Sequence, residues 1–217
     1  MNRIGIFLRY CFIIGLVMLA SCQSNQVKEE KIVEVIRVRD IQMKNLLGIN
    51  AFEWDFLQNP SDLADGSKIY EPKFALIRSF GLVRHYLDWD KLENKEGEYS
   101  FNPTNRGGWN YDVIYERSKG EDIDILVCIK NTPDWLYITY PIKQQDSERV
   151  PLPFKANRES PKSYIAMGRV GFQFAARYGS NINVPPGLVK VNNKPRWNGD
   201  GINQIKIGLN TIKYIEC

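Results

Sequence analysis

The sequence is poor in the residues from which metal centres and disulfide frameworks are built. It contains one histidine and four cysteines among 217 residues, and it has no CxxC pair. Zinc sites draw their ligands from histidines and cysteines at short spacings. This composition therefore argues against a metal site, and no other cofactor is expected.

The chain also lacks a strong charge of one sign. The formal net charge is +4, and it becomes +2 if residues 1–21, with Arg3 and Arg9, are removed. Nucleic-acid binding needs a concentrated basic surface, so no nucleic-acid partner is expected. The hydrophobic content of 43% and the length allow one well-packed domain.

No hydrophobic run is long enough to cross a bilayer. Residues 10–20 form an uncharged, mostly apolar run of eleven residues, and a spanning helix needs about 20. A basic start, a short apolar run and small residues at its end are typical of a secretory signal peptide.

The end of this signal, "LASC" at residues 19–22, resembles the bacterial lipobox. That resemblance implies that residues 1–21 are removed and that lipid attached to Cys22 anchors the protein to a membrane of the cell envelope, at the outer membrane or the cell surface. The alternative is an ordinary secreted protein in which Cys22 is incidental.

Beyond the signal, residues 22–44 are polar and charge-rich and are expected to form a tether, or in their second half a short packed helix or strand. Residues 45–217 alternate apolar runs with helical patterns. This alternation predicts βαβ units and an α/β fold with a parallel sheet. Strands are expected at 46–52, 82–89, 123–130 and 212–217, and helices at 71–81, 110–120 and 160–179.

The last of these helices has the clearest pattern. Ser160 is a good N-cap residue, Pro161 suits the first turn and Gly179 is a good terminator. Apolar and small residues between them recur at helical spacing, which predicts a stripe packed in the core. The stripe consists of Tyr164, Met167, Gly171, Phe174 and Tyr178.

The middle of the chain resembles the second and third βα units of clan A glycoside hydrolases, in the cellulase-like and β-xylosidase-like branches. The family pattern is an apolar strand, a Trp, "W..LE..EG.Y.F", a helix with Asp, a Gly stop, a strand and "P.W". The matching residues are Trp89, Leu92, Glu93, Glu96, Gly97, Tyr99, Phe101, Asp112, Gly120, Pro133 and Trp135. The resemblance implies that residues 45–217 are the N-terminal half, about four βα units, of a (β/α)8 TIM barrel.

The resemblance also implies a carbohydrate substrate. Active sites of such barrels lie at the carboxyl ends of the strands, where this chain places Trp rings for stacking on sugars beside carboxylates and amides for their hydroxyls. The expected substrate-binding residues are Trp54, Arg84, Asp88, Trp89, Asn131 and Trp135.

Each of these residues also has a structural interpretation. In the family, an arginine in the position of Arg84 supports a catalytic carboxylate; alternatively, Arg84 forms an ion pair with Asp88 or another acid. The tryptophans could instead be packing residues. His85, on the opposite face of its strand, is expected to be a hydrogen-bonded packing residue.

Neither catalytic carboxylate of the family has a counterpart in the sequence. The family's general acid follows the fourth strand and its nucleophile lies on the seventh, so both are expected beyond Cys217, in the missing C-terminal half of the barrel. As it stands, the chain is expected to be an inactive fragment of a glycoside hydrolase. The alternatives are a non-catalytic glycan-binding lipoprotein and a module in which two half-barrels pair.

Overall fold

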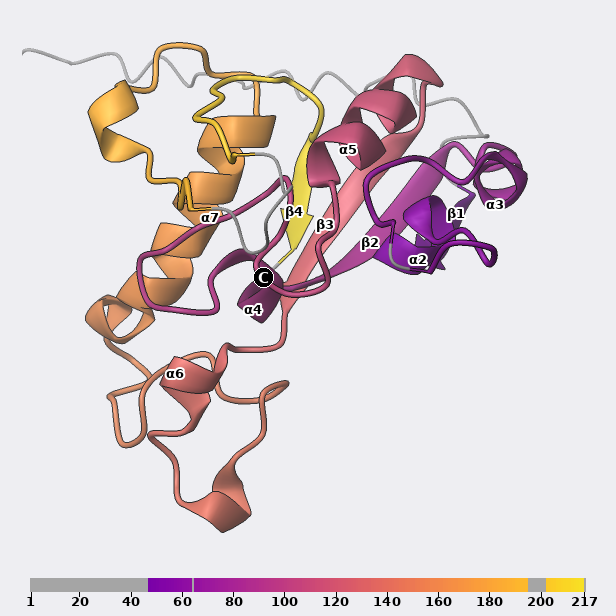
Figure 1. Ribbon diagram of the computed structural model, residues 1–217. Helices are drawn as coiled ribbons and strands as arrows, with labels where there is room; N and C mark the ends of the chain where they lie inside the picture. Colours follow the sequence, from indigo (N-terminus) through magenta and orange to yellow (C-terminus); the bar gives the residue numbers. More distant parts are fainter. Residues whose placement is uncertain (1–46, 64, 195–201, 217) are drawn as a thin grey trace, which may run out of the picture. The chain divides into compact units, whose positions relative to one another are not determined.

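The computed structural model describes residues 47–63, 65–194 and 202–216; the expected signal peptide, the tether and Cys22 lie outside these ranges. Strands alternate with helices along the described chain (Figure 1). The main elements are β1 (Gly48–Ala51), α3 (Glu71–Ile77), β2 (Leu82–Asp88), α5 (Tyr111–Gly120), β3 (Asp124–Lys130), α7 (Ile165–Tyr178) and β4 (Tyr214–Glu216). Short helical turns are α2 (Glu53–Leu57), α4 (Trp89–Leu92), α6 (Asp134–Tyr137), η2 (Ile142–Gln144), η3 (Pro161–Tyr164) and η4 (Pro186–Leu188).

The four strands form one parallel sheet in the order β1-β2-β3-β4. Parallel neighbours need long crossovers, which the helices supply. β2 and β3 pair along their whole length, from Leu82 opposite Asp124 to Asp88 opposite Lys130. β4 pairs with β3 only at Leu126–Cys128. The predicted α/β class with a parallel sheet is confirmed.

The two faces of the sheet differ in their surroundings. Along β2, Val83, His85 and Leu87 are fully buried, whereas Arg84, Tyr86 and Asp88 are only half-buried. Since side chains alternate along a strand, we call the His85 side the covered face and the Arg84 side the open face.

Aromatic side chains from four helices bury the covered face. The His85 ring has edge contacts with Phe56 of α2 and with Tyr115 of α5, at centroid distances of 5.9 and 5.7 Å. Phe56 contacts Phe74 of α3, and Tyr115 contacts Tyr178 of α7. α2, α3, α5 and α7 therefore share one core on this side of the sheet.

A buried ion pair fastens α7 to α5. The Arg177 guanidinium donates to both oxygens of Asp112 at 2.8 and 2.6 Å, and Asp112 also accepts from Tyr178 Oη and Lys206 Nζ, each at 2.8 Å. Burial opposes the charged form of Asp112, but these donors outweigh it and lower its pKa to about 2. The cluster joins α5, α7 and the segment that leads to β4.

The predicted core stripe is confirmed at Phe174 and Tyr178, which are wholly buried. Tyr164, Met167 and Gly171 are only half-buried. The helical segment starts after Ser160 with Pro161, as predicted, but its first turn is not α-helical. Residues 161–164 form a 3-10 turn, the Ser160 side chain caps nothing, and the α-helix begins at Ile165. The Ser163 N–H bonds to the Ser160 carbonyl at 3.0 Å, which winds this stretch more tightly than an α-helix.

The predicted end of the helix at 71–81 is wrong. α3 ends at Ile77, because Ser79 and Phe80 bond three residues back and tighten the chain before Gly81. At β1, the backbone turns into α2 directly after Phe52, and this five-residue helix was not predicted. None of the helices within the described ranges has the length and hydrophobicity to cross a bilayer.

Candidate functional site

The carboxyl ends of β1, β2 and β3 meet at one edge of the sheet, because the strands are parallel. Ligand sites of α/β proteins lie at this edge. It carries the predicted residues Trp54, after β1; Asp88 and Trp89, at the end of β2; and Asn131 and Trp135, after β3.

Three aromatic rings form a continuous stack beside this edge. The rings of Trp54 and Phe52 are nearly parallel, with centroids 4.3 Å apart at 9°. Phe52 stacks in turn on Tyr86 of the open face at 5.2 Å. Trp54, at one end of the stack, is 39% exposed, which makes it the most exposed of the four tryptophans within the described ranges.

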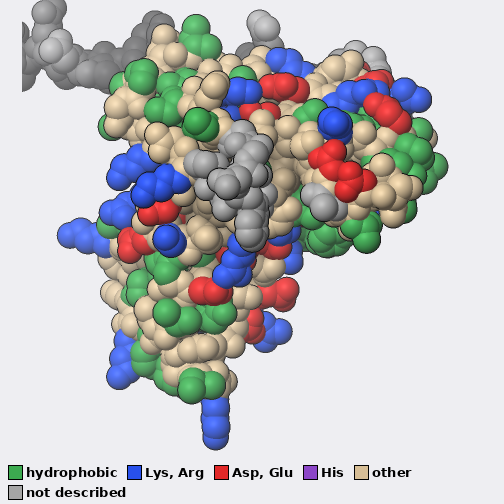
Figure 2. Space-filling view, in the orientation of Figure 1, with side chains coloured by type: hydrophobic (Ala, Val, Ile, Leu, Met, Phe, Trp, Pro, Cys, Tyr) green, Lys and Arg blue, Asp and Glu red, His purple; other side chains and the backbone are tan. Residues whose placement is uncertain are grey.

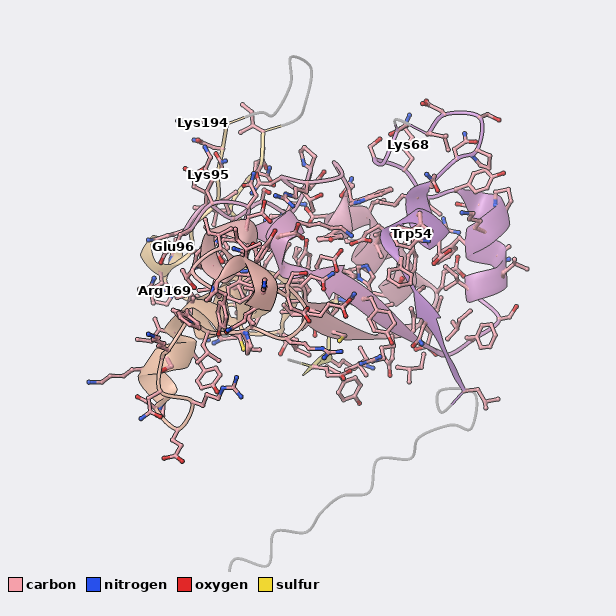
Figure 3. The ribbon with its side chains drawn as sticks, turned by 90° about the horizontal axis from the view of Figure 1, so that it is seen from below. Trp54, Lys68, Lys95, Glu96, Arg169 and Lys194 are labelled. Atoms are coloured by element: carbon pink, nitrogen blue, oxygen red, sulfur yellow. The ribbon has the colours of Figure 1, made fainter. Side chains whose placement is uncertain are left out.

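Local hydrogen bonds fix the position of Trp54. The Phe52 N–H donates to Asp55 Oδ2 at 2.9 Å, which sets the start of α2. Lys73 Nζ of α3 donates to the Trp54 carbonyl at 2.9 Å. Figure 3 shows Trp54 on α2, on the opposite side of the view from Lys95, Glu96, Arg169 and Lys194.

Hydrogen-bonding groups lie at the ends of β2 and β3. Asp88 accepts from Asn131 Nδ2 at 2.6 Å and from Lys91 Nζ at 2.9 Å, and Lys130 Nζ lies 3.7 Å away. Asn131 has a left-handed backbone with φ of 55°, a conformation that asparagine tolerates better than most residues. Its Oδ1 is buried and has no hydrogen-bond partner among the described residues.

A buried carboxylate, Glu53, binds Lys91, which in turn binds Asp88. Glu53 is 0% exposed and accepts from Tyr111 Oη at 2.6 Å and from Lys91 Nζ at 3.0 Å. Burial alone would raise its pKa, but the interaction with His85, the charge of Lys91 and the Tyr111 hydroxyl lower it to about 2. Ionised Glu53 thus holds Lys91 between itself and Asp88.

His85 is a packing residue with one hydrogen bond, as predicted. It is 0% exposed, and its Nδ1 lies 2.9 Å from Tyr115 Oη. Its Nε2 lies 3.7 Å from Glu53 Oε1, which is an electrostatic contact but too long for a hydrogen bond.

The two other predicted tryptophans are held by Glu93. Trp89 is 3% exposed and donates from Nε1 to Glu93 Oε2 at 2.6 Å. Trp135 is half-buried, contacts the Trp89 ring edge-on at 5.9 Å and donates to the Glu93 carbonyl at 3.0 Å. Their indole N–H groups are thus satisfied within the protein, which fixes the orientation of both rings.

A cleft of about 530 Å³ opens beside the end of β3. Its walls combine apolar groups, including Trp89, Tyr164 and Met167, with polar groups, including Lys130 and Asn131. The loop after β3 closes one side through Ser147, Glu148 and Arg149. The cleft is large enough for a small ligand.

The structure pairs Arg84 with Glu216 of β4, and not with Asp88. Its Nε and Nη2 donate to the two carboxylate oxygens at 2.8 and 2.6 Å. Each partner stabilises the charged form of the other, so the pKa of Glu216 is lowered and that of Arg84 is raised. Arg84 also donates to Tyr86 Oη and lies over the Tyr86 ring at 4.5 Å.

Sequence reasoning missed the roles of Lys91, Phe52 and Tyr86. Lys91 links Glu53 to Asp88, and the signal for it was a lysine three residues after an acid at a strand end. Phe52 and Tyr86 connect Trp54 to the open face. Their stacking depends on the turn into α2, for which the sequence carries no clear signal.

The arrangement offers a stacking surface and fixed hydrogen-bonding groups. Within the described residues, no group of three or more histidine, cysteine and acidic side chains could hold a metal ion. No family model, no curated protein and no solved structure matches this chain.

Proposed function

We propose that residues 45–217 form three βα units and the fourth strand of a (β/α)8 barrel of the glycoside hydrolase kind, and that the carboxyl edge of the sheet binds carbohydrate. The observation that carries this proposal is the exposed Trp54 ring, stacked on Phe52 beside the hydrogen-bonded group of Asp88, Lys91 and Asn131.

The strand order supports a barrel. The four strands follow one another in sequence order, whereas a doubly wound sheet reverses its order at a switch point. The helices with known contacts to the sheet share the covered face. The open face carries half-buried polar side chains, as the inward face of a barrel does near its active site.

The chemistry of the edge supports a sugar ligand. A sugar presents apolar C–H faces and a rim of hydroxyl groups, and an indole ring with nearby carboxylate and amide groups complements both. Trp54 supplies the ring. Asp88 supplies acceptors, and Lys91 and Lys130 supply donors.

A non-catalytic glycan-binding role is the second candidate, and the ion pairs at the edge favour it. Glu53 and Asp88 share Lys91, while Asp90 and Asp134 share Arg106 at 2.8 and 2.5 Å. Glycoside hydrolysis needs a general acid and a second carboxylate about 5–5.5 Å apart in retaining enzymes, both free to react. We therefore assign binding, and not bond cleavage, to these paired residues.

Isothermal titration against soluble β-glucans and xylans tests the proposal. Trp54→Ala should weaken the binding of the preferred polysaccharide about tenfold, which corresponds to about 1.4 kcal/mol. Phe172→Ala is the matched control, because Phe172 is 40% exposed on α7 and does not line the cleft at the end of β3. Equal affinity of the two variants would contradict the proposed site.

A reducing-sugar assay on the same polysaccharides separates the two candidates. Polysaccharide binding without sugar release is the expected result if the paired carboxylates at the edge bind carbohydrate but do not cleave it. Sugar release by the purified chain would show that it carries a catalytic pair, and would exclude the non-catalytic alternative.

A further inference from the structure

A second surface lies on the loop that follows α6, away from the aromatic stack. Ile142 of η2 is 86% exposed, more than any other large hydrophobic side chain in the described ranges, and Ile138 is 59% exposed. Pro141 between them is exposed as well. We call residues 138–143 the apolar tip.

The apolar tip is held by its own contacts. Tyr140 donates from Oη to the Leu152 carbonyl at 2.8 Å, and its ring meets Phe154 edge-on at 5.2 Å. Gln145 donates to the Tyr140 carbonyl at 3.0 Å, and the Phe154 N–H donates to Thr139 Oγ1 at 3.1 Å. These contacts hold the loop in a conformation that leaves Ile138 and Ile142 exposed.

Basic side chains accompany the tip. Residues 137–145 and 150–158, the two segments that pack together here, contain Lys143, Lys155 and Arg158, and the acidic Glu159 directly follows Arg158. The acids between these segments, Asp146 and Glu148, have cationic partners in Arg149 and Lys130 at 3.5 and 3.8 Å. Figure 2 shows hydrophobic side chains at the lower end of the view, where Figure 1 places this loop, with a basic side chain projecting beyond them.

We propose that the apolar tip inserts into an anionic lipid surface. Apolar side chains enter the acyl boundary, tyrosines suit the headgroup level, and lysines and arginines bind anionic lipids. A stable protein interface needs about 800 Å² on each partner, which two isoleucines and a proline do not supply. The lipobox-like sequence at residues 19–22 independently predicts a membrane neighbourhood.

Hydrogen exchange measured by mass spectrometry tests the proposal on the full chain. The probes are vesicles of phosphatidylcholine alone and of equimolar phosphatidylcholine and phosphatidylglycerol. Because the readout is local, any binding by the N-terminal segment is common to all samples. We expect the amides of residues 138–145 to exchange about tenfold more slowly on the anionic vesicles, with little change in residues 179–190.

Two substitutions at exposed isoleucines complete the test. Ile142→Ser should abolish the protection of residues 138–145. Ile182→Ser is the matched control, since Ile182 is 73% exposed outside the tip, and it should leave the protection intact. Unchanged exchange of residues 138–145 on anionic vesicles would overturn the proposal. Equal protection on pure phosphatidylcholine would overturn the assignment to an anionic surface.

Discussion

An arginine on the covered side of the sheet and an arginine on the open side each bind a carboxylate through two hydrogen bonds of the same length. Arg177–Asp112 and Arg84–Glu216 both have donor–acceptor distances of 2.8 and 2.6 Å. The side chains of the first pair are 2% and 4% exposed, and those of the second are 31% and 44% exposed.

The two pairs show that the contribution of an ion pair to the free energy of unfolding depends on its burial as well as on its distances. Removing one partner of a buried pair leaves an uncompensated charge without water, which costs far more than the net contribution of the intact pair. Removing one partner of an exposed pair leaves a charge that water solvates. The same two contacts should therefore have very different consequences on the two sides of the sheet.

The largest expected effect is on the covered side. Arg177→Ala leaves Asp112 with Tyr178 and Lys206 but without its main counter-charge, and should lower the free energy of unfolding by about 3–5 kcal/mol. Urea denaturation followed by tryptophan fluorescence measures the loss. If Arg177→Ala lowered the free energy of unfolding no more than Arg84→Ala does, the expected difference between the buried and the exposed pair would be contradicted.

The second effect is a dependence of stability on pH. The folded-state pKa values of Glu53 and Asp112 are lowered to about 2, so their stabilising contributions are complete above their ordinary pKa values of 4.5 and 3.8. These contributions are lost as the pH falls toward 2, and Glu53 accounts for about 3 kcal/mol. Urea midpoints recorded from pH 5 to about pH 2 should fall steeply.

Substitution of the carboxylates sharpens this second test. Glu53→Gln should flatten the fall in stability between about pH 4.5 and 2, because the buried group no longer takes up a proton. Glu216→Gln, on the open face, should leave the steepness nearly unchanged. The reverse order of the two variants would show that the open face governs acid unfolding.

A smaller effect is expected from one hydroxyl on the covered face. Tyr115→Phe removes the partner of His85 Nδ1 but keeps the ring that packs against Phe174 and Tyr178. The loss should be about 1 kcal/mol. A thermal unfolding scan detects it, and an unchanged midpoint would mean that His85 finds another partner.

The smallest effect is expected on the open face. Arg84→Met keeps much of the aliphatic length of the side chain and removes the ion pair with Glu216. Its urea midpoint should stay within experimental error of the parent, because both partners retain access to water. A clear loss of stability would indicate that the open face is shielded from solvent by another part of the protein.

The sequence predicted the order of the strands and long helices well, for a physical reason. Near-continuous apolar runs such as residues 123–130 have few other ways to bury themselves than in a parallel sheet. The alternation along β2 also located His85 on the buried side. Local pattern was sufficient wherever burial alone decided the outcome.

The sequence predicted less of the candidate site, because the site depends on the register between strands and on short turns. The partner of Arg84 lies on β4, with β3 between them, and only the pairing of three strands brings Glu216 opposite Cys128. The Trp54–Phe52 stack depends on a turn made directly after β1. Trp89 is buried in the core, and its indole N–H is bound by Glu93, four residues further along the same chain.

Glu53 has a consequence for how this sequence can vary. One carboxylate contacts Lys91, Tyr111 and His85, which come from three separate segments. A change at any one of these positions leaves the others with an unbalanced charge or an unsatisfied polar group. Among relatives that share this arrangement, positions 53, 85, 91 and 111 are therefore expected to be inherited as a block, and to be replaced together or not at all.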